Sequence, residues 1–295
     1  PNDKLVFGRT FSDHMAEVDW TPDNGWHSPR ITPYHSLSID PAASVLHYAL
    51  ECFEGMKAYL DAEGRARLFR PDMNIARMRN SMHRLSFPDI DPESLQQLIV
   101  DLIRVDKRWI PQDDGFSLYI RPTAISTHPY LGVGASSSVK VFVITSPVGP
   151  YYPEGFKPVS LYADMAHVRA WPGGTGAAKI GSNYAPTIRP QILAAGRGFS
   201  QVLWLFGHED GGAVTEVGTM NMFVLWENED GDLELITPPL GDGTILPGVT
   251  RDSILSLSRD WGEFKVAERV FSMGQLYRAV RAGRVKEAFG AGTAA

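Results

Sequence analysis

Apolar and polar positions follow two different periods along this chain, so the sequence predicts both helices and strands. Residues 72–86 and 93–109 repeat apolar side chains every three or four positions, which is typical of amphipathic helices. The first residues of 116–125 alternate between apolar and polar side chains, which predicts a strand. A period of two places Tyr119 and Arg121 on the same face of that strand, so we expect their side chains to be neighbours.

The same two periods run through the rest of the chain. Residues 57–60 and 65–69 flank a turn-forming Asp-Ala-Glu-Gly sequence and predict a hairpin. Further strands are expected at 139–145, 159–165, 201–206, 219–226 and 232–237. Further helices are expected near 184–196, 249–260 and 272–282. Because helices and strands interleave throughout, the predicted fold class is α/β, with α+β character in each half.

A stretch rich in proline and glycine, residues 146–155, interrupts these elements and predicts a linker. The chain has 295 residues, which is long enough for two domains that each bury a core. We therefore expect a small N-terminal domain at 1–148, an interdomain linker at 149–158 and a larger C-terminal domain at 159–295.

Composition and charge argue against several classes of protein. The net charge is −6 and no basic run is present, so no nucleic-acid partner is expected. Because the longest apolar runs are too short to span a bilayer, and the first residues do not read as a signal peptide, no membrane partner is expected. Cys52 is the single cysteine, which predicts a reducing, cytoplasmic location. The histidines lack metal-ligand spacing, so no metal is expected.

One lysine stands in an unusual frame of small residues. Lys179 lies in the sequence Gly-Gly-Thr-Gly-Ala-Ala-Lys-Ile-Gly, which begins at Gly173. Small residues allow a planar group to approach the backbone, and they leave the ammonium without a neighbouring carboxylate. Such a lysine is a candidate amine nucleophile for a Schiff base. The alternative is a glycine-rich turn whose lysine points to water. A Walker A loop is excluded because Ala178 and Ile180 replace residues that it requires.

Two further segments are candidates for binding a pyridine ring and a phosphate group. Glu216 precedes an uncharged, strand-like run, and a buried carboxylate needs a partner such as a protonated pyridine nitrogen. The alternative is a glutamate in water at the end of a strand. Pro247 and Gly248 precede a predicted helix with Thr250 in its first turn, where free N–H groups suit a phosphate. Simple N-capping is the alternative there.

Two arginines are candidates for binding anions. Arg77 lies at the edge of the apolar stripe of 72–86, where it either clamps a phosphate or is a solvated helix residue. Arg121, which shares a face with Tyr119, suits a substrate carboxylate, or else forms a surface ion pair.

Taken together, these residues resemble a branched-chain amino acid aminotransferase of the fold-type IV pyridoxal phosphate enzymes. The matching blocks occur in order along nearly the whole chain, at 46–49, 53–55, 118–122, 168–171, 173–184, 215–221, 246–251 and 290–294. The resemblance implies the two-domain fold-type IV architecture, with pyridoxal 5'-phosphate as the cofactor. It also implies a homodimer in which loops of the partner chain close the pocket. The implied reaction moves the amino group of L-leucine, L-isoleucine or L-valine to 2-oxoglutarate.

The resemblance also implies a role for each candidate at the cofactor. Lys179 would form the Schiff base and carry the proton between the substrate and the cofactor. Glu216 would pair with the pyridine nitrogen, and Tyr184 would bind the phenolate oxygen. The remaining cofactor-binding residues, most of them at the phosphate, would be Arg77, Thr219, Val249, Thr250 and Thr293.

For the substrate, the resemblance implies an apolar pocket with one cation. The pocket would be shaped by Phe7, Tyr48, Phe53 and Tyr119, with Tyr151 in the interdomain loop. Arg121 would bind the distal carboxylate of glutamate or 2-oxoglutarate, and the backbone at Thr293 and Ala294 would bind the α-carboxylate.

Two features depart from the family pattern. Pro186 and Pro190 lie where the family continues a helix; Pro186 is expected in a first turn, and Pro190 predicts a kink or a later helix start. The sequence also ends at Ala295 in a motif that family members continue, so an incomplete C-terminal domain is expected.

Three alternative functions stay open. Two are enzymes of the same fold, a D-amino acid aminotransferase and an aminodeoxychorismate lyase. The third is a non-catalytic module that binds phosphate through Lys179 and the helix end at Thr250.

Overall fold

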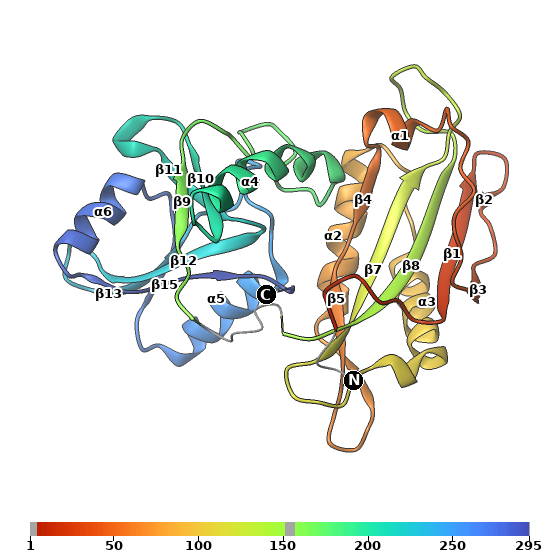
Figure 1. The fold of residues 1–295 in the computed structure, drawn as a ribbon, viewed down its shortest axis with the longest axis horizontal. Coiled ribbons are helices and arrows are strands. Elements are labelled where there is room, and N and C mark those ends of the chain that lie inside the picture. Colours follow the sequence, from red (N-terminus) through yellow and green to blue (C-terminus); the bar gives the residue numbers. More distant parts are fainter. Residues whose placement is uncertain (1–4, 151–156, 295) are drawn as a thin grey trace. The chain divides into compact units, whose positions relative to one another are not determined.

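The computed structural model describes residues 5–150 and 157–294, which form two compact units, each with its own sheet (Figure 1). The first unit contains the residues up to 150 together with Ala178–Ser182 and Ala294. The second contains those from 157 to Ala177 and Asn183–Thr293. The linker expected at 149–158 lies mostly outside the described residues, so the boundaries at 148 and 159 stay predictions.

The first unit is an antiparallel sheet with helices packed against it. The strand order is β2-β1-β8-β7-β5-β6, with β3 also paired to β1 and β4 also paired to β7. Its strands are β1 (His14–Thr21), β2 (Gly25–Trp26), β3 (Arg30–Pro33), β4 (Glu51–Phe53), β5 (Met56–Leu60), β6 (Ala66–Leu68), β7 (Ser117–Ser126) and β8 (Val139–Val148). Its helices are α1 (Ser44–Tyr48), α2 (Pro71–Arg84) and α3 (Pro92–Val105), followed by a 3₁₀ turn at Lys107–Trp109.

The core of this unit lies between α2, α3 and one face of the sheet. The stripe predicted on α2 is buried, with Ile75, Met78 and Met82 no more than 2% exposed. Each fully buried side chain of this size contributes about 1.5–3 kcal/mol. The α3 helix begins where the Asp91 side chain accepts from the N–H of Ser94 at 2.7 Å, an N-cap that the helical spacing alone does not locate.

Strand β8 is longer than predicted. It continues through Val148, so residues 146–148 pair with β7 and do not belong to a linker. Pro147 is tolerated there because β1 pairs with β8 only as far as Val143, which leaves the end of β8 as an edge on that side.

The second unit is a mixed sheet of order β14-β13-β12-β11-β10-β9, with β15 paired to β12. Its strands are β9 (Leu161–Asp164), β10 (Gln201–Phe206), β11 (Ala213–Val217), β12 (Met220–Glu227), β13 (Leu233–Thr237), β14 (Lys265–Glu268) and β15 (Val285–Ala291). Its helices are α4 (Ile188–Gly196), α5 (Val249–Trp261) and α6 (Met273–Arg281). The pairs β9–β10 and β13–β14 are parallel and the others are antiparallel.

Helix α4 begins at Ile188, later than the predicted residue 184. Two 3₁₀ turns precede it, at Gly181–Asn183 and Ala185–Thr187, and the second contains Pro186. Pro190 is the third residue of α4, where a backbone N–H has no partner within the helix. The later start that Pro190 predicted is therefore confirmed.

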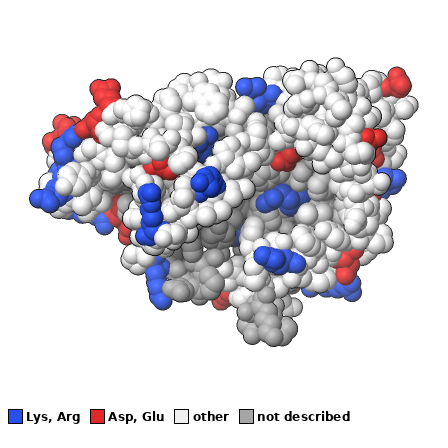
Figure 2. All heavy atoms as spheres, turned by 45° about the horizontal axis from the view of Figure 1, so that its top comes forward, with Lys and Arg blue, Asp and Glu red and all other residues white. Residues whose placement is uncertain are grey.

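No helix in the described part of the chain is long and apolar enough to cross a membrane. On the face drawn in Figure 2, Lys and Arg side chains lie interspersed with Asp and Glu, and no extended surface of one sign is seen.

Candidate active site

The backbone at Lys179 is held by two elements of the first unit. Its N–H donates to Ser81 Oγ of α2 at 2.8 Å, and its carbonyl oxygen accepts from the N–H of Phe53 in β4 at 3.0 Å. Ser81 Oγ also donates to the carbonyl oxygen of Arg77 at 3.0 Å. The next residue, Ile180, forms a β-bridge with the same strand β4. The segment that carries the lysine is thus fixed between a helix and a strand.

The Lys179 amine and the Arg121 guanidinium both lie near the ring of Phe53. Nζ is 4.8 Å from the centroid of the Phe53 ring, and Arg121 Cζ is 4.6 Å from the same centroid, both within cation–π range. Arg121 Nη2 donates to Tyr119 Oη at 3.0 Å, and the Tyr119 ring meets Phe7 edge to face at 4.8 Å. The shared face of Tyr119 and Arg121 is confirmed. Among the described residues Arg121 forms no ion pair, so its alternative as a surface ion pair is wrong.

Two glycines near Lys179 lie so close to other protein atoms that a Cβ would not fit. A Cβ on Gly176 would lie 2.5 Å from Ala170 Cβ and 2.8 Å from the carbonyl oxygen of Gly243. A Cβ on Gly181 would overlap the carboxylate of Glu51. The sequence predicts that small residues admit a planar ligand, but at these two positions the close approach is by protein atoms.

Glu51 is a further carboxylate beside the lysine segment, and no signal in the sequence predicts its place there. It lies in β4 with its carboxylate against Gly181. Burial raises the pKa of Glu51 above its ordinary value of 4.5, and the charge of Arg121 partly opposes that rise. A carboxylate thus lies two residues from Lys179, against the backbone of Gly181, and its neighbours in the sequence do not identify this contact.

Arg77 is buried in an ion pair, so its alternative as a solvated helix residue is wrong. The Arg77 side chain is 8% exposed, and that of its partner Glu54 is fully buried. Arg77 Nε donates to Glu54 Oε1 at 2.7 Å, and Nη2 donates to Oε2 at 2.9 Å. Asn74 Nδ2 and the N–H of Gly55 also donate to Oε2, at 2.9 and 3.1 Å. This network fixes the guanidinium stem, and no signal in the sequence identifies the partner.

In the second unit, Glu216 is buried and held from three sides. Leu246 N–H donates to Oε1 at 2.9 Å, Asn221 Nδ2 donates to the same oxygen at 3.2 Å, and Arg169 Nε lies 3.0 Å from Oε2. Glu216 is 3% exposed, so its alternative as a glutamate in water is wrong. Arg169 is the charged partner that a buried carboxylate needs. Its partnership with Glu216 was not predicted.

Helix α5 begins at Val249 with a free end. Its N-cap is Gly248, no side chain caps it, and Thr250 is the second helical residue. N-capping by Thr250, the alternative function of this segment, is therefore wrong. Gly248 lies against the side-chain oxygen of Asn221, whose Nδ2 donates to Leu246 O at 3.0 Å. The start of α5 is thereby tied to the strand that follows Glu216.

The other cofactor candidates of the second unit lie at turns and strand ends. Thr219 is in the two-residue turn between β11 and β12, where Glu216 pairs with Asn221 in register. Thr293 follows β15, whose last residue Ala291 also pairs with Asn221. Tyr184 precedes the second 3₁₀ turn, and its carbonyl oxygen accepts from Thr187 N–H at 3.0 Å.

Two further substrate candidates, Tyr48 and Ala294, have no described contact with the Phe53 group. Tyr48 ends α1, is 39% exposed, and donates its Oη to the carbonyl oxygen of Leu131. Ala294 follows β15 and is partly buried. Tyr151 lies outside the described residues.

These features fit pyridoxal 5'-phosphate, unit by unit. The first unit holds an amine, Lys179 Nζ, near the Phe53 ring, and a guanidinium, Arg77, that Glu54 holds in place. The second holds a buried carboxylate, Glu216, which suits a ring nitrogen, and an uncapped helix start at Val249, which suits a phosphate.

Comparison with known proteins agrees with this fit. The sequence matches the family model for amino-transferase class IV over residues 51–294. It is 64% identical to the branched-chain-amino-acid aminotransferase of Dictyostelium discoideum, a match that covers 99% of this chain and 76% of that protein. It is 53% identical to the cytosolic branched-chain-amino-acid aminotransferase of Mus musculus, covering 99% and 75%.

A solved structure gives the same result. The branched-chain amino acid aminotransferase from Escherichia coli is similar with a TM-score of 0.72 and 25% identity, covering 96% of this chain and 83% of that chain. The predicted fold-type IV architecture, transferase activity and pyridoxal phosphate cofactor are confirmed. The chain belongs to the class IV aminotransferases, among the branched-chain amino acid aminotransferases.

Proposed function

We propose that the protein transfers the amino group of L-leucine, L-isoleucine or L-valine to 2-oxoglutarate, giving branched-chain 2-oxo acids and L-glutamate. The observation that carries this proposal is the Phe53 ring, which both Lys179 Nζ and Arg121 approach. Arg121 also contacts Tyr119, whose ring packs against Phe7. Apolar rings suit a branched side chain. The guanidinium suits the distal carboxylate of the second substrate.

Selectivity among the three branched amino acids should be modest. One methylene in an apolar pocket is worth only about 1–3 kcal/mol, so leucine, isoleucine and valine are all expected to react. A substrate with a distal carboxylate needs the side chain of Arg121 in addition, because a buried anion without a partner is unfavourable.

Residues of the first unit would do the proton chemistry. Pyridoxal 5'-phosphate, when bound, supplies a ring that accepts the electron pair left on the substrate α-carbon. Lys179 would anchor it and then take the proton from the α-carbon with Nζ, which requires a neutral amine at that moment. The two hydrogen bonds that fix the Lys179 backbone would hold Nζ on one side of the substrate.

The remaining candidates would position the cofactor. Glu216 would hold the proton on the ring nitrogen, and Tyr184 would donate to the phenolate oxygen. The phosphate would be bound by Arg77, Thr219, Val249 and Thr250. Thr293 would contact the cofactor, and with Ala294 it would offer backbone N–H groups to the α-carboxylate.

Reduction with borohydride tests the role of Lys179. The holoenzyme is reduced and its peptides are mapped by mass spectrometry, and the pyridoxyl group is expected on Lys179. Attachment to any other residue would exclude the proposed mechanism.

A substrate assay separates the alternatives of the same fold. Leucine with 2-oxoglutarate is expected to yield glutamate. Turnover of D-alanine without L-leucine would favour a D-amino acid aminotransferase, and a product formed without any amino acceptor would favour a lyase.

A homodimer is the assembly that we propose, with loops of the partner chain closing the pocket. Its support is an exposed apolar group at α1 and the loop after β7, where Leu46, Tyr48, Leu131 and Val133 are 59, 39, 62 and 84% exposed. Apolar surface of this kind favours a protein contact. Val133→Glu should shift the mass by light scattering toward that of a monomer, whereas Val159→Glu should not. A monomeric parent protein would contradict the proposal.

We also propose two domains, 1–148 and 159–295, and a cytoplasmic location. The domain proposal is supported by the two units, and limited proteolysis should cut first within 149–158. The location is supported by Cys52 being the single cysteine. Fractionation of cells that express the native gene tests it, and recovery in an organelle would contradict it.

A further inference from the structure

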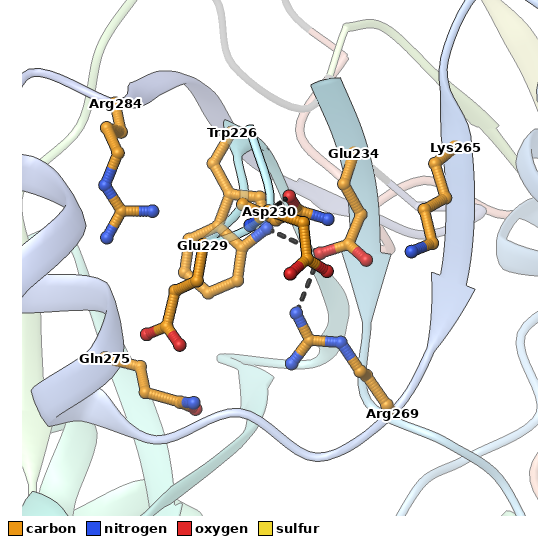
Figure 3. A pocket seen from close by; sticks show the side chains of 9 residues that line it. Trp226, Glu229, Asp230, Glu234, Lys265, Arg269, Gln275 and Arg284 are labelled. Carbon is orange, nitrogen blue, oxygen red and sulfur yellow. Dashed lines mark hydrogen bonds and ion pairs between the residues drawn. The ribbon is translucent and has the colours of Figure 1, made fainter. Parts of the chain in front are cut away.

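A hollow of about 230 Å³ lies in the second unit, at the far end of β12 from the turn that carries Thr219 (Figure 3). It is lined by Trp226, Asn228, Glu229, Asp230, Glu234, Lys265, Arg269, Gln275 and Arg284. No role assigned above uses any of these side chains. The volume is below the roughly 300–1,000 Å³ of pockets for drug-sized ligands, so an occupant must be small.

The lining is polar and its charges balance. Trp226 is the single apolar side chain among the nine, so an apolar ligand would gain little here. Three lining residues are cationic (Lys265, Arg269 and Arg284) and three are anionic (Glu229, Asp230 and Glu234). A wall of net charge zero gives no advantage to a simple anion or cation, but it suits a molecule that carries both charges.

Two of the cationic lining residues, Arg269 and Lys265, already have carboxylate partners within the protein. Glu234 Oε2 accepts from Arg269 Nη2 and from Trp226 Nε1, both at 2.8 Å, and the Glu234 side chain is 2% exposed. Lys265 Nζ lies 3.8 Å from Asp232 Oδ2, at the limit of an ion pair. These groups form a rigid base around the indole.

Three charges remain without a carboxylate or cation partner. Arg284 Nη1 donates to the backbone oxygen of Glu227 at 2.7 Å, and none of the described carboxylates forms an ion pair with it. In the same described part of the chain, Glu229 and Asp230 form no ion pair. Arg278, a cation of helix α6 in the same unit, is held by both oxygens of Asp210 at 2.8 Å.

The acidic side chains are presented by an ordered turn. Asn228 Oδ1 accepts from the N–H groups of Asp230 and Asp232 at 3.0 and 2.9 Å, and Asn228 N–H donates to the carbonyl oxygen of Asp232 at 2.9 Å. In Figure 3, Glu229, Arg284 and Gln275 lie on one side of Trp226. A carboxylate site and an ammonium site thus face the same small space before any ligand binds, which lowers the entropy lost on binding.

We propose that this hollow is a second ligand site that binds a small zwitterion of the α-amino acid class. The ligand carboxylate pairs with Arg284, its ammonium pairs with Glu229, and its remaining atoms cover the indole of Trp226. A polar uncharged side chain is favoured, because Gln275 and Asn228 are neutral hydrogen-bonding residues of the lining. The site lies apart from the residues assigned to the reaction, so the proposal stands or falls independently of the transaminase proposal.

Calorimetric titration of the holoenzyme with L-glutamine tests the proposal. Two analogues serve as probes of charge: glutaramate, which lacks the α-amino group, and 4-aminobutanamide, which lacks the carboxylate. The parent protein is expected to bind glutamine and neither analogue. Arg284→Gln and Glu229→Gln should each weaken glutamine binding roughly tenfold or more, because each removes one charged contact.

Matched controls are exposed residues outside the hollow. Arg281→Gln and Glu263→Gln should bind glutamine like the parent, and all four variants should keep the parent's transaminase rate. No glutamine binding to the parent, equal binding by all variants, or equal binding of either analogue would overturn the proposal. If the parent protein shows no transaminase activity but binds glutamine as expected, the proposed function is wrong and the second ligand site stands.

Discussion

The buried pair of Arg77 and Glu54 allows a sharp test by Arg77→Met. Methionine keeps an unbranched apolar stem but removes the guanidinium, which leaves the carboxylate of Glu54 fully buried without a cation. Removing one partner of a buried ion pair costs about 3–5 kcal/mol. Asn74 and Gly55 would still donate to that carboxylate, so we expect the lower end, about 3 kcal/mol. At about 2–4 °C per kcal/mol, the melting temperature should fall by about 6–12 °C.

The matched control is Arg79→Met on the same helix. Arg79 also forms an ion pair, but its side chain and that of Asp89 are 38% and 69% exposed. An exposed pair contributes only about 0–1 kcal/mol. Scanning calorimetry and urea unfolding of both variants, without added cofactor, compare the two pairs directly. If Arg77→Met destabilises no more than Arg79→Met, the reasoning from burial is refuted.

The other predictions concern the surroundings of the lysine and of the cofactor carboxylate. Glu51→Gln should stabilise the protein only at higher pH. The folded protein binds the Glu51 proton more tightly than the unfolded chain does, so the free energy of unfolding falls as pH rises from 4.5 through the raised pKa of Glu51. Glutamine carries no proton to lose, so the variant avoids this fall. Urea unfolding at about pH 4 and about pH 8 checks this, and an equal effect at both would contradict it. Gly176→Ala should destabilise the protein by about 1–3 kcal/mol, because the added Cβ would clash with Ala170 and with the backbone at Gly243. Gly196→Ala is the control: its Cβ would meet no described atom beyond its own helix within 4 Å, so thermal unfolding should show a neutral or stabilising effect. Glu216→Ala should retain cofactor attachment but lower kcat severely relative to the exposed Glu227→Ala, and an unchanged kcat would disprove the role at the ring nitrogen.

Part of the fold could be predicted because it follows from local spacing. The apolar stripe of α2 and the shared face of Tyr119 and Arg121 depend on helical and strand periods, which any short segment reveals. The late start of α4 follows from the chemistry of Pro190 itself. The strands β2, β3 and β4, of two to four residues each, were not predicted, because so few residues carry too little periodic signal.

The candidate site could be predicted only as a set of residues. The chemistry of each side chain, together with the family resemblance, singled out Lys179, Glu216 and Arg77, because an amine, a carboxylate and a guanidinium have few uses in such surroundings. Their partners could not be predicted. Glu54, Arg169 and Ser81 hold these residues in place, yet nothing near any of them in the sequence identifies the contact.

The sequence by itself thus determined the elements whose signal is local and the chemical types at the site. Only the tertiary structure decided which groups meet: Glu51 against Gly181, Glu54 with Arg77, and the balanced charges around Trp226. The physical reason is that such contacts depend on strand register and on packing between distant segments. Burial then sets their strength, since the same ion pair contributes little in water and several kcal/mol in the interior.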